Sequence, residues 1–306
     1  MSVQRWQVAG AVVDRIEEML GPLFDARSFF PDHDEAVLER VRLRLGDDHV
    51  TERGRIIASM HSWLVRIDGR LVLVDGCIGD GKDRQPYHRW TGMDSGWEAR
   101  LASVGVTPGQ IDFVCCTHLH VDHVGWNTRL RDGRWQPTFP NARYLFSKRE
   151  VEHARELRAQ PKADDFARVS DKVWDDSVLP VLEAGLVDQV GDGHDLLPGR
   201  LHVEATPGHT PGSCSIVLCE HGEDRALFTG DVCHHPVQVF EPDWNSDFCE
   251  DAEQARRTRR ALLGRLADGG ALMMPAHFGW PHAVRIHRAG DGFDLEFVEP
   301  DEVLTR

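Results

Sequence analysis

The sequence predicts an α/β protein, and two observations carry that prediction. Short apolar segments of strand length alternate along the 306 residues with longer segments of helical pattern. Four of the apolar segments end in side chains that can bind a metal ion, which places those side chains together at strand ends. Hydrophobic residues make up 41% of the chain and charged residues 28%, as in ordinary globular proteins. We expect a single domain over residues 1–306.

Composition excludes several classes of function. The net charge of −15 argues against a nucleic-acid partner, and no stretch approaches the roughly 20 apolar residues of a membrane span. The N-terminus lacks an apolar run long enough for a secretory signal. The seven cysteines are odd in number and form no Cys-x-x-Cys pair, which favours buried free thiols. We therefore expect a cytoplasmic protein.

Residues 1–50 show no chemistry of their own, and two strands are expected after them. Residues 1–50 are interpreted as a flank or cap with a helical pattern near Leu38. Residues 57–67 and 71–75 are predicted strands joined by a turn at Asp68-Gly69. His61, in the first of these strands, is interpreted as a core residue. A short helix is expected over residues 97–104.

The segment after the next strand carries most of the candidate ligands. The apolar run 113–116 is followed by His118, His120, Asp122 and His123, four metal-competent side chains within six residues. Alternate residues of an extended chain point to one side, so Asp122 and His123 can serve one site only if the chain turns there. Gly125 favours such a turn.

A polar helical insert is expected over residues 148–184, broken at Pro161 and Pro180. Trp174 in this insert could cover the mouth of a pocket or could simply pack. The basic run Arg256-Arg257 and Arg259-Arg260 lies among leucines and is interpreted as a solvated helix face.

Three further strands each deliver one candidate ligand. The alternating segment 201–205 leads into Pro-Gly-His at His209, the apolar segment 226–229 leads to Asp231, and the segment 271–274 leads to His277. A helix is expected from about residue 251 to 266. Seven candidate ligands therefore follow four strand ends, which predicts a metal site.

This ordered set resembles the metallo-β-lactamase superfamily. The match consists of His118-x-His120-x-Asp122-His123, the Pro-Gly-His turn, Gly230-Asp231 and His277, and it covers roughly residues 56–287. The resemblance implies a four-layer αβ/βα sandwich, in which two facing mixed β-sheets are covered by helices and hold metals at one edge. It also implies two ions, one held by His118, His120 and His209 and the other by Asp122, His123 and His277. Asp231 would bridge them.

Imidazole and carboxylate ligands favour two Zn²⁺, although manganese, iron or cobalt are alternatives. The branch that fits best contains lactonases and methyl parathion hydrolase-like enzymes. Acyl-homoserine lactonases typically have tyrosine three residues after the bridging aspartate, whereas this chain has His234 there, as the parathion hydrolase-like group does. The acyl-homoserine substrate is therefore open, while lactone or ester hydrolysis is favoured.

The resulting hypothesis is a dinuclear hydrolase in which a bridging hydroxide attacks the carbonyl of a lactone or ester. The expected catalytic residues are Asp231, Asp122 and His234, the last as a proton donor or simply as a rim residue. The alternatives are a phosphotriester hydrolase, a β-lactamase and a non-catalytic metal-binding protein. We expect a small-molecule substrate, while the oligomeric state stays open between a monomer and a homodimer of the kind common in lactonase-like relatives. Candidate residues for the substrate pocket are Trp126, Trp174, His234 and Phe240, and candidates for its apolar wall are Trp126, Phe240 and Trp244.

Overall fold

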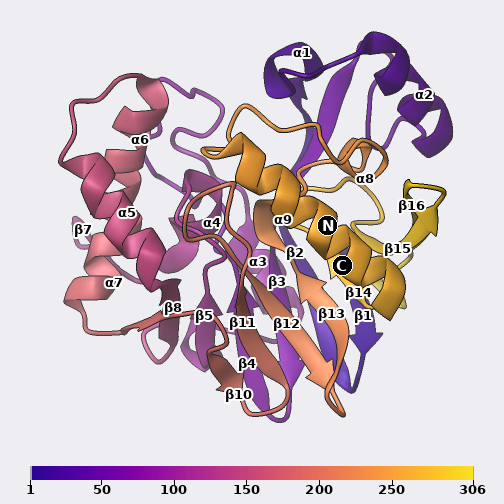
Figure 1. The fold of residues 1–306 in the computed structure, drawn as a ribbon. Coiled ribbons are helices and arrows are strands. Elements are labelled where there is room, and N and C mark those ends of the chain that lie inside the picture. Colours follow the sequence, from indigo (N-terminus) through magenta and orange to yellow (C-terminus); the bar gives the residue numbers. More distant parts are fainter. Residues whose placement is uncertain (1, 306) are drawn as a thin grey trace. The chain divides into compact units, whose positions relative to one another are not determined.

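The computed structural model describes residues 2–305, which form two large β-sheets and one small one (Figure 1). The chain divides into two compact units. Unit 1 contains residues 2–18, 60–191 and 301–305, and unit 2 contains residues 19–59 and 192–300. Both large sheets combine parallel and antiparallel pairs. The predicted α/β class with two mixed sheets is confirmed, whereas the single domain over residues 1–306 stays a prediction.

Unit 1 is built on the eight-stranded sheet, whose order is β17-β1-β2-β3-β4-β5-β8-β9. The pairs β4–β5, β5–β8 and β8–β9 are parallel, so the carboxyl ends of these strands lie at one edge. β2 and β3 continue along the chain into unit 2. The strands are β1 (Ser2–Val8), β2 (Ala11–Asp25), β3 (Arg55–Ile67), β4 (Arg70–Val74), β5 (Phe113–Cys115), β8 (Arg143–Ser147), β9 (Val187–Val190) and β17 (Glu302–Thr305).

β3 and β4 form the predicted hairpin. Asp68 and Gly69 have φ values of 48° and 75°, as the favoured two-residue turn requires. His61 in β3 is buried, and its ring lies edge-on to that of Trp63 at 4.6 Å. This packing agrees with the prediction that His61 is a core residue.

Residues 2–25 differ from the expected flank, because they form two strands of this sheet. β2 is difficult to recognise since residues 14–18 read Asp-Arg-Ile-Glu-Glu, a pattern that argues against a buried strand. The structure buries these charges together with partners. Asp14 bonds to Arg5 at 2.6 Å, and Glu18 accepts two backbone N–H bonds at 2.9 Å. Paired polar groups therefore replace the apolar residues that a strand pattern normally shows.

The helices of unit 1 include the predicted one at residues 97–104 and the predicted insert. The insert is interrupted around Pro161 as expected, but Pro180 does not break it. A π-helical turn, η3 (Trp174–Val178), joins α6 to α7, and Pro180 lies in the first turn of α7, where a missing N–H is tolerated. The helices are α3 (Trp97–Ser103), α4 (Val121–Val124), α5 (Lys148–Arg158), α6 (Asp165–Val173) and α7 (Leu179–Glu183), with 3-10 turns η1 (Pro108–Gln110) and η2 (Gly125–Asn127). A separate hairpin consists of β6 (Thr128–Arg131) and β7 (Arg134–Pro137).

Unit 2 is built on the seven-stranded sheet, whose order is β10-β11-β12-β13-β14-β15-β16. Neighbouring strands are antiparallel except for β13 and β14, which are parallel and are connected through α8 and α9. The strands and helices predicted in this half of the chain are confirmed. The elements are β10 (Asp195–Leu197), β11 (Leu201–Ala205), β12 (Cys214–Glu220), β13 (Glu223–Phe228), η4 (Gly230–Val232), α8 (Val237–Phe240), α9 (Ala252–Gly269), β14 (Leu272–Met274), β15 (Ala283–Ala289) and β16 (Gly292–Val298).

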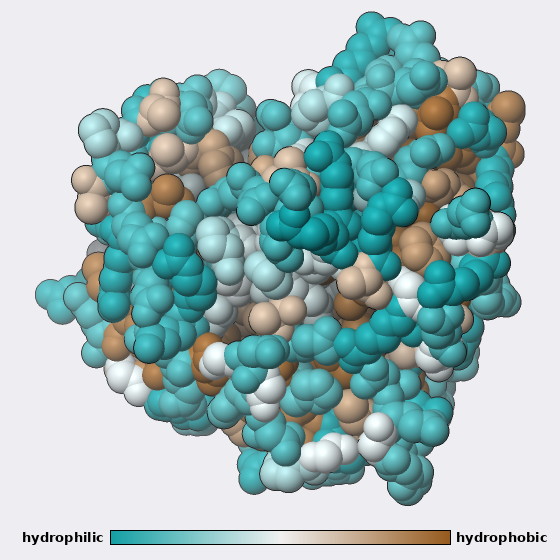
Figure 2. Space-filling view, viewed as in Figure 1, coloured by the Kyte–Doolittle hydropathy of each residue, from teal (hydrophilic) through white to brown (hydrophobic). Residues whose placement is uncertain are grey.

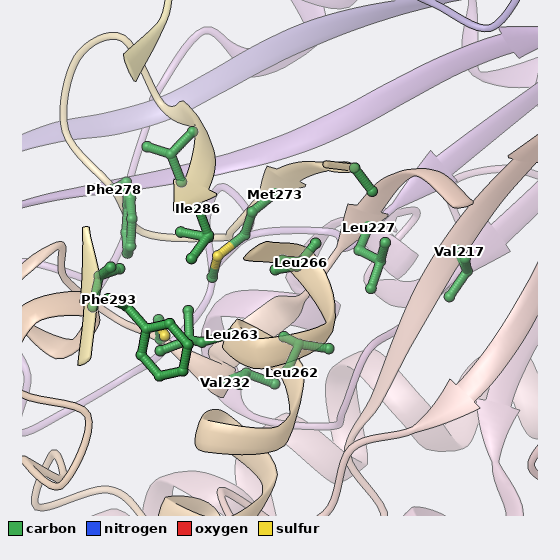
Figure 3. Close-up of a cluster of buried hydrophobic side chains, with 14 of the residues drawn as sticks. Val217, Leu227, Val232, Leu262, Leu263, Leu266, Met273, Phe278, Ile286 and Phe293 are labelled. Carbon is green, nitrogen blue, oxygen red and sulfur yellow. The ribbon is translucent and has the colours of Figure 1, made fainter. Parts of the chain in front are cut away.

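α9 packs on this sheet through one apolar face (Figure 3). Leu262, Leu263 and Leu266 recur at helical spacing and are buried in a cluster that also contains Met273 and Ile286. Replacing a buried leucine of this kind by alanine costs about 2–5 kcal/mol. The cluster therefore fixes the helix that connects the two parallel strands.

The basic run of α9 is only partly the solvated face that the sequence predicts. Arg257 and Arg260 are exposed, but Arg259 is fully buried. It continues the buried series that includes Ala255 and Leu262, so one position of the apolar face is taken by a cation. The prediction is wrong for Arg259 because composition alone does not show which of several adjacent arginines faces the sheet.

Residues 26–45 of unit 2 form two short helices, the second of which the sequence pattern predicts. Asp34 caps it by accepting hydrogen bonds from two backbone N–H groups of its first turn. Leu38 and Val41 on its inner side pack in a cluster with Phe29 and Trp244. These helices are α1 (Ala26–Phe29) and α2 (Glu35–Leu45).

Hydrophilic residues cover most of the face shown in Figure 2, including the strip over α9. The seven cysteines are free thiols, and all but Cys249 are buried, as predicted. Within residues 2–305, no helix is both long and apolar enough to cross a lipid bilayer.

Candidate metal centre

The first set of candidate ligands lies in unit 1, directly after strand β5. The chain runs through His118 and His120, and α4 begins at the next residue. His120 is the N-cap residue and has extended backbone, so Asp122 and His123 follow within a helical turn. The turn that these adjacent ligands require is therefore present.

Gly125 permits this turn through close packing rather than through an unusual φ angle. Its φ is −58°, but a Cβ atom there would lie 1.8 Å from the carbonyl oxygen of Ile78. Its N–H donates to the carbonyl oxygen of Cys77 at 2.7 Å. The loop after β4 thus lies directly on the ligand segment, and only glycine leaves enough room.

The imidazole rings of unit 1 form a compact group. The ring centroid of His118 lies 4.6 Å from that of His120 and 4.0 Å from that of His123. Asp122 Oδ1 lies 3.7 Å from Nε2 of His123. His118 and His123 are buried, while His120 and Asp122 are half-buried. Nitrogen and oxygen donors grouped in this way suit a divalent cation.

Asp75 orients His123, a role that the sequence analysis missed. Its Oδ2 lies 2.9 Å from Nδ1 of His123, and its carboxylate accepts bonds from the N–H and the hydroxyl group of Thr117 at 2.8 and 2.9 Å. A carboxylate on Nδ1 leaves Nε2 for a metal, an arrangement common around metal-binding histidines. The available signal was position, because Asp75 follows β4, the parallel neighbour of β5.

The second set of candidate ligands lies at three strand ends of unit 2. β11, β13 and β14 lead to His209, Asp231 and His277, respectively. Asp231 Oδ2 lies 3.3 Å from Nε2 of His209, and Oδ1 lies 3.0 Å from Nε2 of His277. All three side chains are buried. The two oxygens of one carboxylate therefore face two different imidazoles.

Backbone contacts hold both histidines of unit 2 in place. Nδ1 of His277 lies 2.9 Å from the carbonyl oxygen of Ser59, which leaves Nε2 directed at the carboxylate. His209 lies in the predicted tight turn, where Gly208 has φ 132° and a Cβ would lie 2.3 Å from the backbone nitrogen of Ala255. The turn thus rests on the start of α9, and the position demands glycine.

His234 lies beside the second set. Its Nε2 is 3.2 Å from Asp231 Oδ2 and 3.3 Å from the hydroxyl oxygen of Ser246. Burial lowers the pKa of His234 below its usual value, against the opposing effect of the Asp231 carboxylate. With His209 and Asp231 it forms a group whose possible ligand atoms lie within 4.8 Å of one another.

These donor sets fit divalent metal ions. Imidazole nitrogens and carboxylate oxygens are the ligands that zinc and related transition metals bind. His123 and His277 each have Nδ1 held by an oxygen and Nε2 directed at other donors. A histidine oriented in this way is prepared for a metal before the metal arrives.

The candidate pocket residues lie in separate surroundings. Trp126 stacks on Trp97 with centroids 4.8 Å apart, and Trp174 lies among arginine side chains of α5. Phe240 lies under an arginine of α2 at 4.7 Å. Of the pocket candidates, His234 contacts a candidate metal ligand, Asp231, and a substrate-binding role stays a prediction for all five.

Comparison with known sequences identifies the family of the chain. The family described as "Metallo-beta-lactamase superfamily" matches residues 59–277. The N-acyl homoserine lactonase AttM of Azorhizobium caulinodans is 28% identical over 174 residues, which are 53% of this chain and 60% of that protein. The chain therefore matches less than two thirds of the length of this curated relative.

Solved structures show the same fold. The hydrolase AbOPH of the beta-lactamase superfamily superposes with a TM-score of 0.81 at 22% identity, over 98% of this chain and 99% of the other. AidC, described as a dizinc quorum-quenching lactonase in complex with a product, gives a TM-score of 0.78 at 19% identity, over 99% and 98%.

Proposed function

Because the chain belongs to the metallo-β-lactamase superfamily, we propose that it is a metal-dependent hydrolase that opens a lactone or cleaves a related carboxylic ester. The observation that carries the proposal is the position of Asp231, whose two oxygens face Nε2 atoms of His209 and His277. A carboxylate so placed can bind two ions at once. The names of AttM and AidC as lactonases support the choice of substrate.

We assign the seven ligands to two divalent ions. A tetrahedral zinc site uses four ligands, so seven side chains are too many for one ion. The resemblance to the family implies that His118, His120 and His209 would hold one ion, that Asp122, His123 and His277 would hold the other, and that Asp231 would be shared. Zinc is the first choice, and manganese, iron and cobalt accept the same donors.

When bound, such a pair of ions supplies a water of lowered pKa and polarises the substrate carbonyl. The chain's own residues orient that chemistry. Asp75 and the carbonyl of Ser59 hold the Nδ1 atoms of His123 and His277, which leaves each Nε2 for a metal ion. His234 stands 3.2 Å from Asp231, where a ring nitrogen can hydrogen-bond a substrate oxygen or the leaving group.

The test is hydrolysis by metal-quantified protein. We expect activity on a panel of lactones and aryl esters, loss of that activity on chelation, and recovery with Zn²⁺. Asp231→Asn should lower both metal content and kcat, because it removes the charge that the two ions share. His194→Ala, at an exposed histidine, is the matched control and should leave both unchanged. Full activity after exhaustive metal removal would refute the proposal.

A phosphotriester is the second candidate substrate, and His234 favours it. The acyl-homoserine lactonases have tyrosine at this position, whereas the parathion hydrolase-like group has histidine. The metal ligands suit attack on carbonyl and phosphoryl centres alike. Comparing kcat/KM for lactones and a paraoxon-type ester decides between the two. A preference for the phosphotriester by tenfold or more would replace the lactone assignment.

A further inference from the structure

Glu150 bonds to the backbone of the ligand segment in unit 1. It lies in the first turn of α5, and its side chain is only 3% exposed. Oε2 accepts a hydrogen bond from the backbone N–H of Leu119, the residue between His118 and His120, at 3.1 Å. The contact joins residues 31 positions apart. A buried carboxylate of the insert thus reaches the centre of the His-x-His pair.

The backbone on both sides of His118 is held by buried carboxylates. Asp75 accepts from the N–H of Thr117 at 2.8 Å, and Glu150 accepts from the N–H of Leu119 at 3.1 Å. These two amides precede and follow His118 along the chain. Hydrogen bonds to charged acceptors are stronger than those between neutral groups, so both peptide planes are firmly oriented. The Leu119 N–H belongs to the peptide that directly follows His118, and the Thr117 N–H lies one peptide farther back, so the two bonds anchor the short stretch of backbone that carries His118.

The insert contacts the ligand segment at a second place. The ring of Phe166 in α6 lies edge-on to that of His120, with centroids 5.1 Å apart and planes at 87°. The far end of the insert is tied down by Asp176, whose carboxylate bonds twice to the buried guanidinium of Arg84 at 2.6 and 2.9 Å. Such a tied element can act as a rigid support.

From this geometry we infer that Glu150 is a positioning residue for the metal ligands His118 and His120, acting through the Leu119 amide. The inference rests on the proposed metal site, and it assigns the helical insert a supporting role beside any role as a lid. Residues that orient metal ligands typically alter metal affinity by about 10–100-fold when they are replaced. The effect requires an acceptor oxygen at the right reach, and not merely a negative charge.

Two conservative replacements separate reach from charge. Glu150→Asp keeps the charge but is one methylene too short to reach the Leu119 amide. Glu150→Gln keeps an acceptor oxygen at the same reach but loses the charge. Glu152→Gln, at an exposed glutamate of the same helix, is the matched control. Zn²⁺ affinity of the metal-free protein is measured by competition with a chromophoric chelator, and the Co²⁺-substituted proteins are compared by their visible absorption bands.

We expect Glu150→Asp to weaken Zn²⁺ binding by about 10–100-fold and to change the Co²⁺ bands. Glu150→Gln should stay within about threefold of the unmodified protein, because the neutral amide oxygen still accepts the bond. The opposite order, or two variants that bind as tightly as Glu152→Gln, would overturn the inference. If Glu150→Asp does not fold, Glu150→Met, which has similar length and no acceptor oxygen, takes its place with the same expected loss, and an affinity equal to that of Glu152→Gln overturns the inference. Absence of metal binding by the unmodified protein would instead refute the proposed function.

Discussion

Arg259→Ala should strongly destabilise the fold, although Arg259 belongs to a run of arginines. Its guanidinium is fully buried and donates at 2.8–3.0 Å to four oxygens: the carbonyls of Val232, Pro242 and Trp244 and the side chain of Asn245. A hydrogen bond from a charged group contributes about 1.5–3 kcal/mol. Truncation also removes the cost of burying the cation, so the four bonds do not simply add. Because four acceptors each lose a donor, and only the Trp244 carbonyl keeps another, from Gln238, we expect a loss of about 3–5 kcal/mol in the free energy of unfolding.

Urea unfolding followed by tryptophan fluorescence measures this loss, provided that the m-value stays constant between variants. Arg260→Ala is the matched control, because Arg260 is exposed and its pair with Asp243 at 2.7 Å contributes about 1 kcal/mol or less. Arg259→Lys keeps the charge but reaches fewer acceptors, so its loss in the free energy of unfolding should lie between those of Arg259→Ala and Arg260→Ala. If the free energies of unfolding of Arg259→Ala and Arg260→Ala differ by less than about 1 kcal/mol, the buried hydrogen bonds of Arg259 do not stabilise the fold and the prediction is wrong.

Two further perturbations test other parts of the structure. Burial lowers the pKa of His49 from 6.5 to about 4, so the unfolded chain binds a proton at this residue more tightly than the folded chain does. The free energy of unfolding is therefore highest above pH 6.5. It falls by about 3 kcal/mol on acidification to pH 4. Urea unfolding of the unmodified chain and of His49→Gln at several pH values checks this, and a difference that does not change with pH contradicts it. Gly125→Ala places a Cβ 1.8 Å from the Ile78 oxygen and should cost more than about 3 kcal/mol, whereas Gly191→Ala, with open space, should change stability by less than about 1 kcal/mol. Equal thermal unfolding temperatures for the two glycine variants would contradict this prediction, because they would show that the loop containing Ile78 moves aside at little cost.

The parts of the fold that the sequence predicts are those with local signals. The strands before Thr117, Asp231 and His277 are short apolar runs with their polar residues immediately following, so both the strand and the ligand lie within one window of residues. The hairpin at Asp68-Gly69 is likewise a local matter of turn chemistry. The family resemblance then implied two mixed sheets, which the structure contains, and a grouping of the ligands, which stays a prediction.

The parts that could not be predicted depend on partners far along the chain. Glu18 is buried because it bonds to the N–H groups of Ile78 and Gly79, and Glu150 is buried because it bonds to that of Leu119. From sequence alone, both glutamates look like ordinary solvent-facing charges. Only the tertiary structure reveals that the acceptor and the donor meet, and so only the structure identifies β2 and the support of the ligand segment.

The hydrogen bond between His277 and the carbonyl of Ser59 joins residues 218 positions apart, and unit 2 is interrupted along the chain by residues 60–191. At a synthesis rate of roughly 5–20 residues per second, about 10–40 s pass between the synthesis of Ser59 and that of His277. During that time Phe29 and Phe30 lack the later residues of their cluster, Val237 and Trp244. The growing chain on the ribosome, more than the finished protein, is therefore the form that exposes apolar surface to chaperones and to aggregation.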